Sequence, residues 1–546
     1  MAKKNFAIRS ECQIGTAQLS RGDVQSVGQA LRARRVLMLA VLAVIAICWP
    51  EGGFSQTNAG PLQADTRIAG PALMEDVDIL EQAYKTMHAG LYRYNSPAEM
   101  DLKFDELRER LKSGATLAES YLALLEFATA IRCGHTYPNF FNQPKAVVNA
   151  LFTGTNRLPF EFRWLGERMF ISRNLSPDAT LAPGTEILAI NGIPARDVLR
   201  RLMKVARADG GNDAKRRALL EVQGVDRYEP FDIYYALFFP LRPPQFELSV
   251  RQFGAATNAT VLVNPLSYAA RLAAIKVSPE KMRGDDAVWT LSFLNDRTAL
   301  LKMPSWALYN SKWDWKQFLT ETFSNLNNHA HCNLIIDLRD NEGGITDVGY
   351  EIARHLIRKD IATGGTHRYI RFRTAPKNLI PYLDTWDWGF LDWSTNTVNP
   401  AFQPAGNAVY YSLIESDNNN GGDVLHPLAP RFDGKVVVLM NSENSSATFI
   451  FEQLAQQNKL ATLIGEPSGG NRRGINGGAF FFLNLPNSKI EMDLPLVATL
   501  PSTPQPDAGL LPDKDVSITP HGLATGKDEV LAAALKYLHA GKVRQN

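Results

Sequence analysis

The stretch Asn441-Ser442-Glu443-Asn444-Ser445-Ser446-Ala447-Thr448-Phe449-Ile450 decides how the rest of the chain is interpreted. It follows an apolar run, Lys435 to Met440, that predicts a buried strand, and it opens a helical pattern over Ala447 to Gln457. A helix N-terminus offers free backbone N–H groups and the positive end of the helix dipole. Ser446 is therefore a candidate nucleophile with donors for an oxyanion beside it. A serine before a helix is also typical of an N-cap, so the turn alone does not decide between the two interpretations.

Length and composition describe a large globular protein. The 546 residues predict about three domains. Apolar residues make up 45% and charged residues 21% of the chain, which is enough to build a core. The formal net charge is +2, and the N-terminal 55 residues contribute the positive excess. The remaining chain is close to neutral, which gives no reason to expect a nucleic acid as partner.

The N-terminus carries an export signal. Arg32, Arg34 and Arg35 precede an unbroken apolar run, Val36 to Trp49, that is short for a membrane span and typical of a signal-peptide core. Residues 1–55 are therefore predicted to be a signal peptide. A retained anchor that tethers the protein through residues 36–49 is the alternative. Either interpretation predicts a periplasmic or secreted protein, membrane-anchored in the second case.

Residues 56–148 are predicted to form a linker followed by a helical bundle. Two capping boxes mark helix starts, one at Ser96 with Glu99 and one at Thr116 with Glu119. The helical pattern ends at Cys133-Gly134-His135-Thr136. His135 therefore follows directly after an apolar helix.

Residues 149–270 change to a strand pattern. Alternating residues from Phe160 to Trp164, a Gly turn, a strand and the Asn191-Gly192 hairpin turn, followed by a helix, make a compact module. This module resembles a PDZ-like domain. The resemblance implies peptide capture by strand addition, but the usual carboxylate-binding loop is not evident, so a structural or gating role is an equal alternative.

Residues 271–530 are predicted to form an α/β core, with a C-terminal tail over 531–546. Buried strands alternate with helices, which favours this class. The predicted strands are Ala299–Met303, Cys332–Leu338 and Lys435–Met440, and the predicted helices are Phe318–Leu326, Val348–Ile357 and Ala447–Gln457. Residues 345–434 are a long excursion rich in aromatic residues. It is either a satellite hydrophobic cluster or a wall of a substrate cleft.

Two glycine-paired loops accompany the serine turn. Asp337-Leu338-Arg339-Asp340-Asn341-Glu342-Gly343-Gly344 closes one predicted strand, and Gly465-Glu466-Pro467-Ser468-Gly469-Gly470-Asn471 follows another. With the serine turn and Leu511-Pro512-Asp513, these motifs occur in the order that resembles the C-terminal processing (tail-specific) serine peptidase family. The resemblance covers most of residues 288–525. It implies a multidomain α/β protein with a crotonase-like core and peptide hydrolysis by an activated serine.

The resemblance assigns roles to residues of this chain. Ser446 matches the nucleophile. The Ala447 N–H, with one from Gly343 or Gly344, would form the oxyanion hole. In the Ser–Lys members a lysine follows the second glycine loop, and here that position is Asn471.

Without that lysine, Ser446 requires another base. The histidine-dependent, tricorn-core-like branch of the family takes a histidine from the N-terminal helical region, and His135 fits this position. A neutral imidazole is suited to accept the hydroxyl proton near pH 7. The group that orients His135 is left open between Asp507, the nearest acid in the segment before Leu511-Pro512-Asp513, and the amide of Gln505.

The sequence therefore predicts an exported serine endopeptidase that acts on peptides or proteins through an acyl-enzyme on Ser446. No metal and no cofactor is implied. The alternative is a non-catalytic crotonase-like module that binds peptides or apolar ligands. The substrate preference and the oligomeric state are not indicated by the sequence.

Overall fold

The computed structural model divides the chain into two units, Met1–Leu62 and Gln63–Asn546, and every contact reported below lies in the second. The predicted signal segment falls outside the described residues. Among the described helices, none combines the length and the apolar character that crossing a bilayer requires. The structure describes residues 61–154, 156–239, 244–275, 288–309, 311–329, 333–363, 365–399, 409–414 and 424–540.

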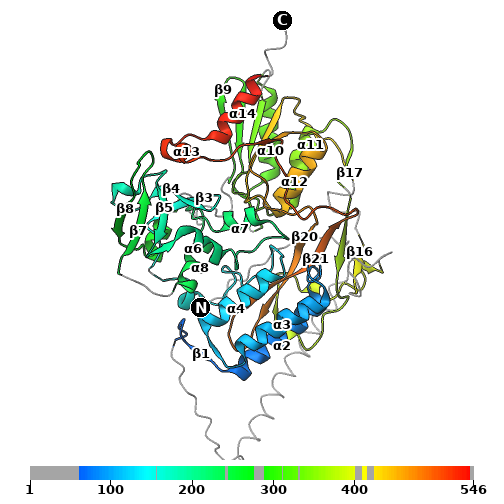
Figure 1. Ribbon diagram of the computed structural model, residues 1–546. Coiled ribbons are helices and arrows are strands. Elements are labelled where there is room, and N and C mark those ends of the chain that lie inside the picture. Colours follow the sequence, from blue (N-terminus) through cyan, green and yellow to red (C-terminus); the bar gives the residue numbers. More distant parts are fainter. Residues whose placement is uncertain are drawn as a thin grey trace, which may run out of the picture. The chain divides into compact units, whose positions relative to one another are not determined.

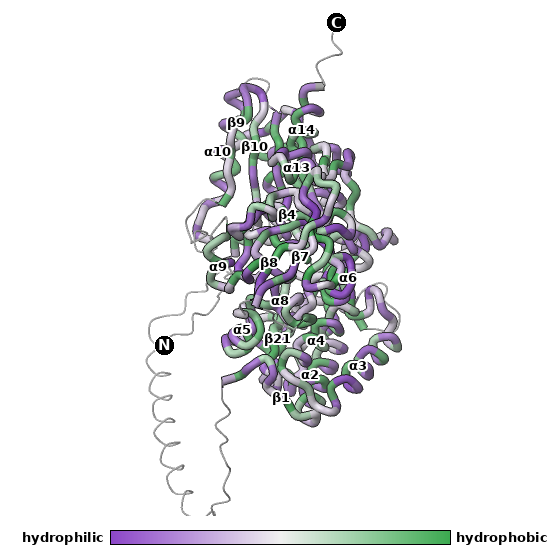
Figure 2. The backbone as a smooth tube through the Cα atoms, turned by 60° about the vertical axis from the view of Figure 1, so that its left-hand side comes forward, coloured by the Kyte–Doolittle hydropathy of each residue, from purple (hydrophilic) through white to green (hydrophobic). Residues whose placement is uncertain are grey.

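Three long helices open the compact unit, drawn in blue and cyan in Figure 1. They are α2 (Gly70–Met87), α3 (Pro97–Leu111) and α4 (Leu117–Ala130). Both predicted capping boxes are confirmed: Ser96 pairs with Glu99 at α3, and Thr116 pairs with Glu119 at α4. Each cap satisfies helix N–H groups that would otherwise lack acceptors and contributes about 1 kcal/mol. Figure 2 shows that α3 carries many hydrophilic residues along its length.

A second part is an antiparallel sheet in the order β3-β4-β5-β7-β8, with β6 paired to β5. Its strands are β3 (Phe160–Leu165), β4 (Arg168–Asn174), β5 (Glu186–Ile190), β6 (Ile193–Pro194), β7 (Phe246–Arg251) and β8 (Ala259–Val263). The helices of this part are α5 (Lys145–Leu151), α6 (Ala195–Leu202), α7 (Asp213–Leu219), α8 (Pro230–Phe238) and α9 (Tyr268–Ala273). We call residues 160–263 the sheet module.

The predicted α/β core is present as a six-stranded sheet in the order β22-β19-β18-β11-β10-β9. Its strands pair in parallel, except that β9 runs antiparallel to β10. The strands are β9 (Thr290–Asn295), β10 (Thr298–Lys302), β11 (Asn333–Asp337), β18 (Val436–Met440), β19 (Thr462–Gly465) and β22 (Lys514–Asp515). The three predicted strands and the three predicted helices of this core are confirmed within a few residues.

Alternating side chains of these strands face two hydrophobic clusters. Leu334 and Ile336 face a cluster with α10 (Trp315–Asn327), α11 (Thr346–Leu356) and α12 (Ser446–Gln457). Ile335 on β11 faces the other cluster, with α14 (Glu529–Ala540). Strands buried on both faces read as continuous apolar runs, which explains why they were recognisable in the sequence. A short helix, α13 (Pro520–Thr525), precedes α14.

A second six-stranded sheet was not predicted from the sequence. Its order is β14-β20-β21-β13-β16-β15. Part of the aromatic excursion supplies its shorter strands, so this stretch belongs to an organised sheet. The strands are β13 (Thr366–Ile370), β14 (Leu383–Asp384), β15 (Thr397–Val398), β16 (Tyr411–Leu413), β20 (Ile475–Asn484) and β21 (Glu491–Pro501). Two short antiparallel pairs complete the strands: β1 (Arg67–Ile68) with β2 (Ala115–Thr116), and β12 (Ile361–Ala362) with β17 (Val424–Leu425).

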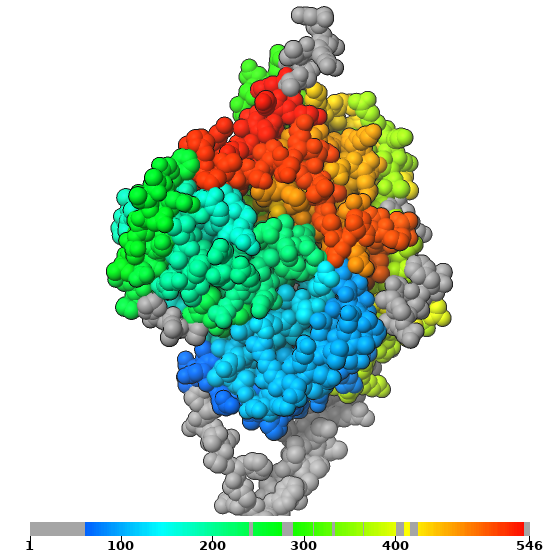
Figure 3. All heavy atoms as spheres, viewed as in Figure 1, coloured from blue at the N-terminus to red at the C-terminus, as the bar shows by residue number. Residues whose placement is uncertain are grey.

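The helices dock on the β20–β21 hairpin through one buried carboxylate. Asp76 on α2 is 2% exposed and accepts hydrogen bonds from the backbone N–H groups of Asn487 (2.9 Å) and Ser488 (2.8 Å). The Tyr84 hydroxyl donates to the Asp493 carbonyl at 2.8 Å. In Figure 3 the helices (blue), the sheet module (green) and the orange segment adjoin on one face. These contacts connect the chain segment that carries His135 with the second sheet.

Candidate active site

Ser446 is the first residue of α12 and has a φ of 55°. A positive φ is uncommon for a residue other than glycine and indicates a locally strained turn between β18 and α12. The preceding Ser445 occupies the N-cap position, but its side chain makes no capping hydrogen bond to the helix. Its Oγ instead donates to the Glu342 carbonyl at 3.3 Å. The turn therefore presents Ser446, which is half-buried, without the capping bond that the alternative interpretation requires.

Asparagine side chains join the serine turn to the first glycine loop. Asn441 Nδ2 donates to Asp340 Oδ1 at 2.7 Å, and the Asp340 N–H donates back to Asn441 Oδ1 at 3.1 Å. Asn444 is fully buried, and its Nδ2 donates to the Asn341 carbonyl at 3.1 Å. The Thr448 hydroxyl donates to the same carbonyl at 3.0 Å. These bonds fix the loops that follow β11 and β18 against each other.

The first glycine of the pair, Gly343, lies directly against Ser446. A β-carbon on Gly343 would stand 2.9 Å from Ser446 Cβ and 2.9 Å from the Ala447 nitrogen, so only glycine fits there. The Gly343 N–H donates to Asn341 Oδ1 at 2.9 Å and is therefore engaged. Among the described residues, neither the Gly344 N–H nor the Ala447 N–H has a hydrogen-bond acceptor. Gly344 is thus the glycine of the pair with a free donor.

His135 follows α4 and is half-buried. Its ring lies 6.0 Å from the Phe480 ring, centroid to centroid, and a β-carbon on Gly477 would stand 4.0 Å from its Nε2. Within the described chain, the buried Nδ1 has no hydrogen-bond partner, and no hydrogen bond joins His135 to Ser446. Catalytic hydrogen bonds are often long or unformed in structures without substrate. The free ring nitrogens leave His135 available to exchange a proton.

Burial lowers the pKa of His135 below its usual value, because desolvation disfavours the imidazolium ion. Asp209 is the strongest opposing charge and raises this pKa, while Arg207 lowers it. Glu342 also raises it, and His135 in turn helps to lower the pKa of Glu342. Arg207 connects the two segments, because it bonds the carbonyl of Gly134, next to His135, and lies 3.6 Å from Glu342, next to Gly343.

Asp507 does not contact His135 in this structure. Its Oδ2 accepts from Arg132 at 2.6 Å, and its Oδ1 accepts from the Gly211 N–H at 2.8 Å and from Asn471 Nδ2 at 2.7 Å. Burial raises the pKa of Asp507, but these donors together lower it below its usual range. Gln505 accepts from Arg472 at 2.9 Å. Asn471, at the position of the absent lysine, thus binds a carboxylate.

Sequence reasoning missed three charged residues, two between α6 and α7 and one on α7. Asp209 is 4% exposed, and its Oδ1 accepts from the Gly134 N–H at 3.1 Å. Arg207 donates to the Gly134 carbonyl at 2.9 Å and lies 3.6 Å from Glu342 Oε2. Lys215 on α7 is 2% exposed. Its Nζ contacts Glu342, which precedes the glycine pair, and also Glu443 of the serine turn. Asp209-Gly210-Gly211-Asn212 predicts only a turn, so no sequence signal connects these residues with His135.

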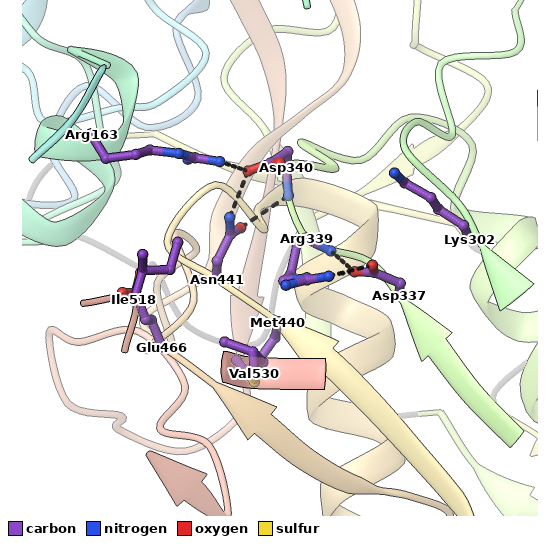
Figure 4. Close-up of a pocket in the computed structure, with 10 residues that line it drawn as sticks. All are labelled: Arg163, Lys302, Asp337, Arg339, Asp340, Met440, Asn441, Glu466, Ile518 and Val530. Carbon is purple, nitrogen blue, oxygen red and sulfur yellow. Dashed lines mark hydrogen bonds and ion pairs between the residues drawn. The ribbon is translucent and has the colours of Figure 1, made fainter. Parts of the chain in front are cut away.

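A small cavity of about 200 Å³ lies beside the first glycine loop. Figure 4 shows Arg163 reaching Asp340, which also bonds Asn441, while Arg339 pairs with Asp337. The lining of this cavity includes neither Ser446 nor His135. The lining residues are Arg163, Lys302, Asp337, Arg339, Asp340, Met440, Asn441, Glu466, Ile518 and Val530.

Comparison with known proteins identifies the class of the core. Residues 297–479 match the model of peptidase family S41, a range that contains both the glycine pair and Ser446. No curated protein matches the chain. Among solved structures, mature CPAF complexed with lactacystin is similar with a TM-score of 0.57 and 14% identity, covering 87% of this chain and 98% of that chain. A second structure of mature CPAF is similar with a TM-score of 0.56 and 13% identity, covering 87% of this chain and 98% of that chain. The photosystem II D1 C-terminal processing protease is matched at a TM-score of 0.36 and 14% identity, over 81% of this chain and 92% of that one.

The CPAF likeness supports the fold, a mixed α/β multidomain arrangement similar to S41 peptidases. The family match over residues 297–479 indicates a serine-type peptidase domain, which is a hydrolase. Residues 297–479 thus match a peptidase family S41 domain, in agreement with the resemblance to serine peptidases noted in the sequence. Peptides or proteins are the substrate class that such a domain supports.

Proposed function

We propose that the protein is an exported serine endopeptidase in which Ser446 is the nucleophile and His135 the general base. The observation that carries this proposal is the turn at Ser446. A strained serine stands at a helix N-terminus, and the neighbouring N–H groups of Ala447 and Gly344 lack acceptors. Unused donors beside a candidate nucleophile are what an oxyanion hole requires.

The reaction begins when Ser446 Oγ attacks the peptide carbonyl carbon while its proton passes to the neutral His135 imidazole. The oxyanion binds the N–H groups of Ala447 and Gly344. The imidazolium then returns the proton to the leaving nitrogen, the C–N bond breaks, and an ester on Ser446 remains. Water attacks this ester with His135 as base, which releases the acid product and restores the serine. Because burial lowers the pKa of His135, the imidazole is neutral near pH 7.

Asp209 is the better-supported orienting group for His135. It is buried, bonds the adjacent Gly134 N–H and exerts the strongest favourable field on the imidazolium. Asp507, the candidate from the sequence, is instead engaged by Arg132. We therefore propose that Asp209 stabilises the imidazolium and that Asp507 holds the Arg132 segment in place.

Aromatic side chains extend from His135 and suit the apolar parts of a peptide. The Phe480 ring lies 6.0 Å from His135 and 5.7 Å from Trp386, and the Trp386 ring lies 5.6 Å from Phe390. Trp388 in the same segment is 52% exposed. This aromatic wall also favours the second candidate function, a non-catalytic module that binds peptides or apolar ligands.

Export and the PDZ-like nature of the sheet module are further parts of the proposal. Export rests on the basic and apolar segment before Trp49, and the PDZ-like assignment rests on the Asn191-Gly192 hairpin between strands. Intact-mass measurement of protein recovered from a periplasmic or culture fraction tests export. Recovery from the cytoplasm alone would contradict it.

Covalent labelling by a fluorophosphonate tests the catalytic assignment. We expect the wild-type protein to be labelled and to hydrolyse peptides, and Ser446→Ala to lose both while its thermal unfolding is unchanged. Ser445→Ala is the matched control, because Ser445 makes no capping bond and should retain labelling. A folded wild-type protein that is neither labelled nor active on peptides favours the binding module instead.

A further inference from the structure

Lys215 is a buried lysine that no sequence motif singles out. It belongs to the sheet module, yet its ammonium lies between the two loops of the candidate site. Its Nζ contacts Glu342 Oε1 at 2.5 Å, the Glu443 carbonyl at 2.9 Å and Glu443 Oε2 at 2.6 Å. An ammonium has three N–H donors, and all three have acceptors here. Lys215 therefore has no lone pair for the Ser446 proton and is not the base.

The two residues that Lys215 joins flank the candidate oxyanion hole. Glu342 directly precedes the glycine pair, and Glu443 lies three residues before Ser446. The Glu443 carboxylate is 9% exposed and the Glu342 carboxylate 45% exposed. The Lys215 ammonium therefore connects the loop that carries the free Gly344 N–H with the turn that carries the free Ala447 N–H. The asparagine bonds join these loops at Asp340 and Asn341, and Lys215 joins them at Glu342, directly before the glycine pair.

The placement of Lys215 is itself specified by its surroundings. Asn212 caps α7 through a bond from the Lys215 N–H to its Oδ1 at 3.1 Å, and Asn212 Nδ2 donates to the carbonyls of Ser468 and Gly470. A β-carbon on Gly469 would stand 2.7 Å from Lys215 Cδ, so the second glycine loop encloses the lysine stem. The stem therefore has little freedom, and the ammonium position is well defined.

A second cation of the module reaches the same loops. Arg163 on β3 bonds Glu221 at 2.6 Å and lies 3.4 Å from Asp340, which in turn bonds Asn441 (Figure 4). Module side chains thus contact the first glycine loop at Asp340, through Arg163, and at Glu342, through Lys215 and Arg207. Lys215 also bonds the serine turn at Glu443.

We propose that Lys215 is a positioning residue that holds the Glu342 loop and the Glu443 turn at the spacing the oxyanion hole requires. This inference rests on the proposed function, since it assumes that Ser446 is acylated. It predicts that Lys215 affects the acylation rate more than substrate binding, because misplacing oxyanion donors lowers kcat by about 100-fold. The alternative is that Lys215 only neutralises the buried Glu443 carboxylate.

Four proteins separate these explanations: wild type, Lys215→Met, Lys215→Met/Glu443→Gln and the control Lys204→Met, which changes an exposed lysine of the same module. For each, thermal unfolding, kcat and KM on one peptide, and the fluorophosphonate labelling rate are measured on folded protein. Lys215→Met should lower kcat and the labelling rate by about 100-fold with KM nearly unchanged. The double variant should recover thermal stability but remain slow. Lys204→Met should behave as wild type.

Recovery of kcat in the double variant would overturn the positioning role, since charge neutralisation would then explain the lysine. Full activity of a folded Lys215→Met would overturn it as well. If Lys215→Met does not fold, the double variant carries the test, because it leaves no unpaired buried charge at Glu443. A wild-type protein that is not labelled would contradict the catalytic assignment of Ser446. A labelled wild type together with a fully active Lys215→Met would contradict only the positioning role of Lys215.

Discussion

At the scale of single residues, burial and the surrounding charges determine the direction in which the pKa of His135 is shifted. Its burial lowers the pKa, and Asp209 opposes this shift more than any other charge. A histidine base must be neutral to accept the Ser446 proton, so kcat/KM should fall as the pH drops through the His135 pKa. Because that pKa lies below its usual 6.5, the acid limb of the profile should lie below pH 6.5.

The pH profile also identifies the orienting acid. Asp209→Asn keeps an oxygen for the Gly134 N–H but removes the negative charge, so the His135 pKa should fall further and the acid limb should move to lower pH. Asp507→Asn is the matched control and should leave the limb in place, because Asp507 pairs with Arg132. Profiles of kcat/KM from pH 4 to 8 on the three proteins measure this. If the acid limb moved in Asp507→Asn but not in Asp209→Asn, Asp507 would be the orienting acid, as the sequence suggested.

At the scale of elements, the loop after β11 owes its shape to two glycines. Gly343 has a φ of 105° and leaves no room for a side chain beside Ser446 and Ala447. Gly343→Ala should therefore displace the serine turn and lower kcat by about 100-fold or more. Gly166→Ala is the matched control: its φ is 65°, but a β-carbon there meets nothing within 4 Å. That variant should lose about 1 kcal/mol of stability and keep its activity.

Thermal unfolding, kcat and KM of both variants test this expectation. Equal losses of kcat in Gly343→Ala and Gly166→Ala would assign the effect to backbone strain in general. Nearly unchanged kcat in Gly343→Ala would mean that the glycine loop does not support the reaction. The comparison separates the steric argument from the conformational one, because both positions require a positive φ.

The elements also show what the sequence can and cannot specify. The capping boxes at Ser96 and Thr116 and the apolar strands of the core were predictable, because each depends on neighbouring residues. The second sheet was not, since β13 pairs with β21 across more than a hundred residues of chain. Ser446 was predicted from ordered motifs, and His135 from the absence of a lysine at Asn471 and from its place after an apolar helix. Asp209 and Lys215 act on residues far away in the sequence and have no local pattern that marks them.

At the scale of the whole molecule, the proposed base and the proposed nucleophile come from chain segments that are far apart in the sequence. His135 follows the N-terminal helices, and Ser446 belongs to the core. The helices are joined to the β20–β21 hairpin through Asp76, and β20 contributes Phe480 beside His135. We therefore expect folding and activity to depend on this docking, even though Asp76 lies outside the candidate site.

Asp76→Ala tests this dependence against Asp78→Ala on the same helix. The first change removes the acceptor of the buried Ser488 N–H and the half-buried Asn487 N–H, which should cost about 3 kcal/mol and lower the melting temperature by several degrees. The Asp78 carboxylate is 66% exposed and pairs with Arg108 at the surface, so its loss should cost less than about 1 kcal/mol. Because Gln63–Asn546 is one compact unit, circular dichroism and peptide hydrolysis should be lost together on heating. Two separated transitions, with the helices melting first, would show that His135 is carried by a part that unfolds independently of the core.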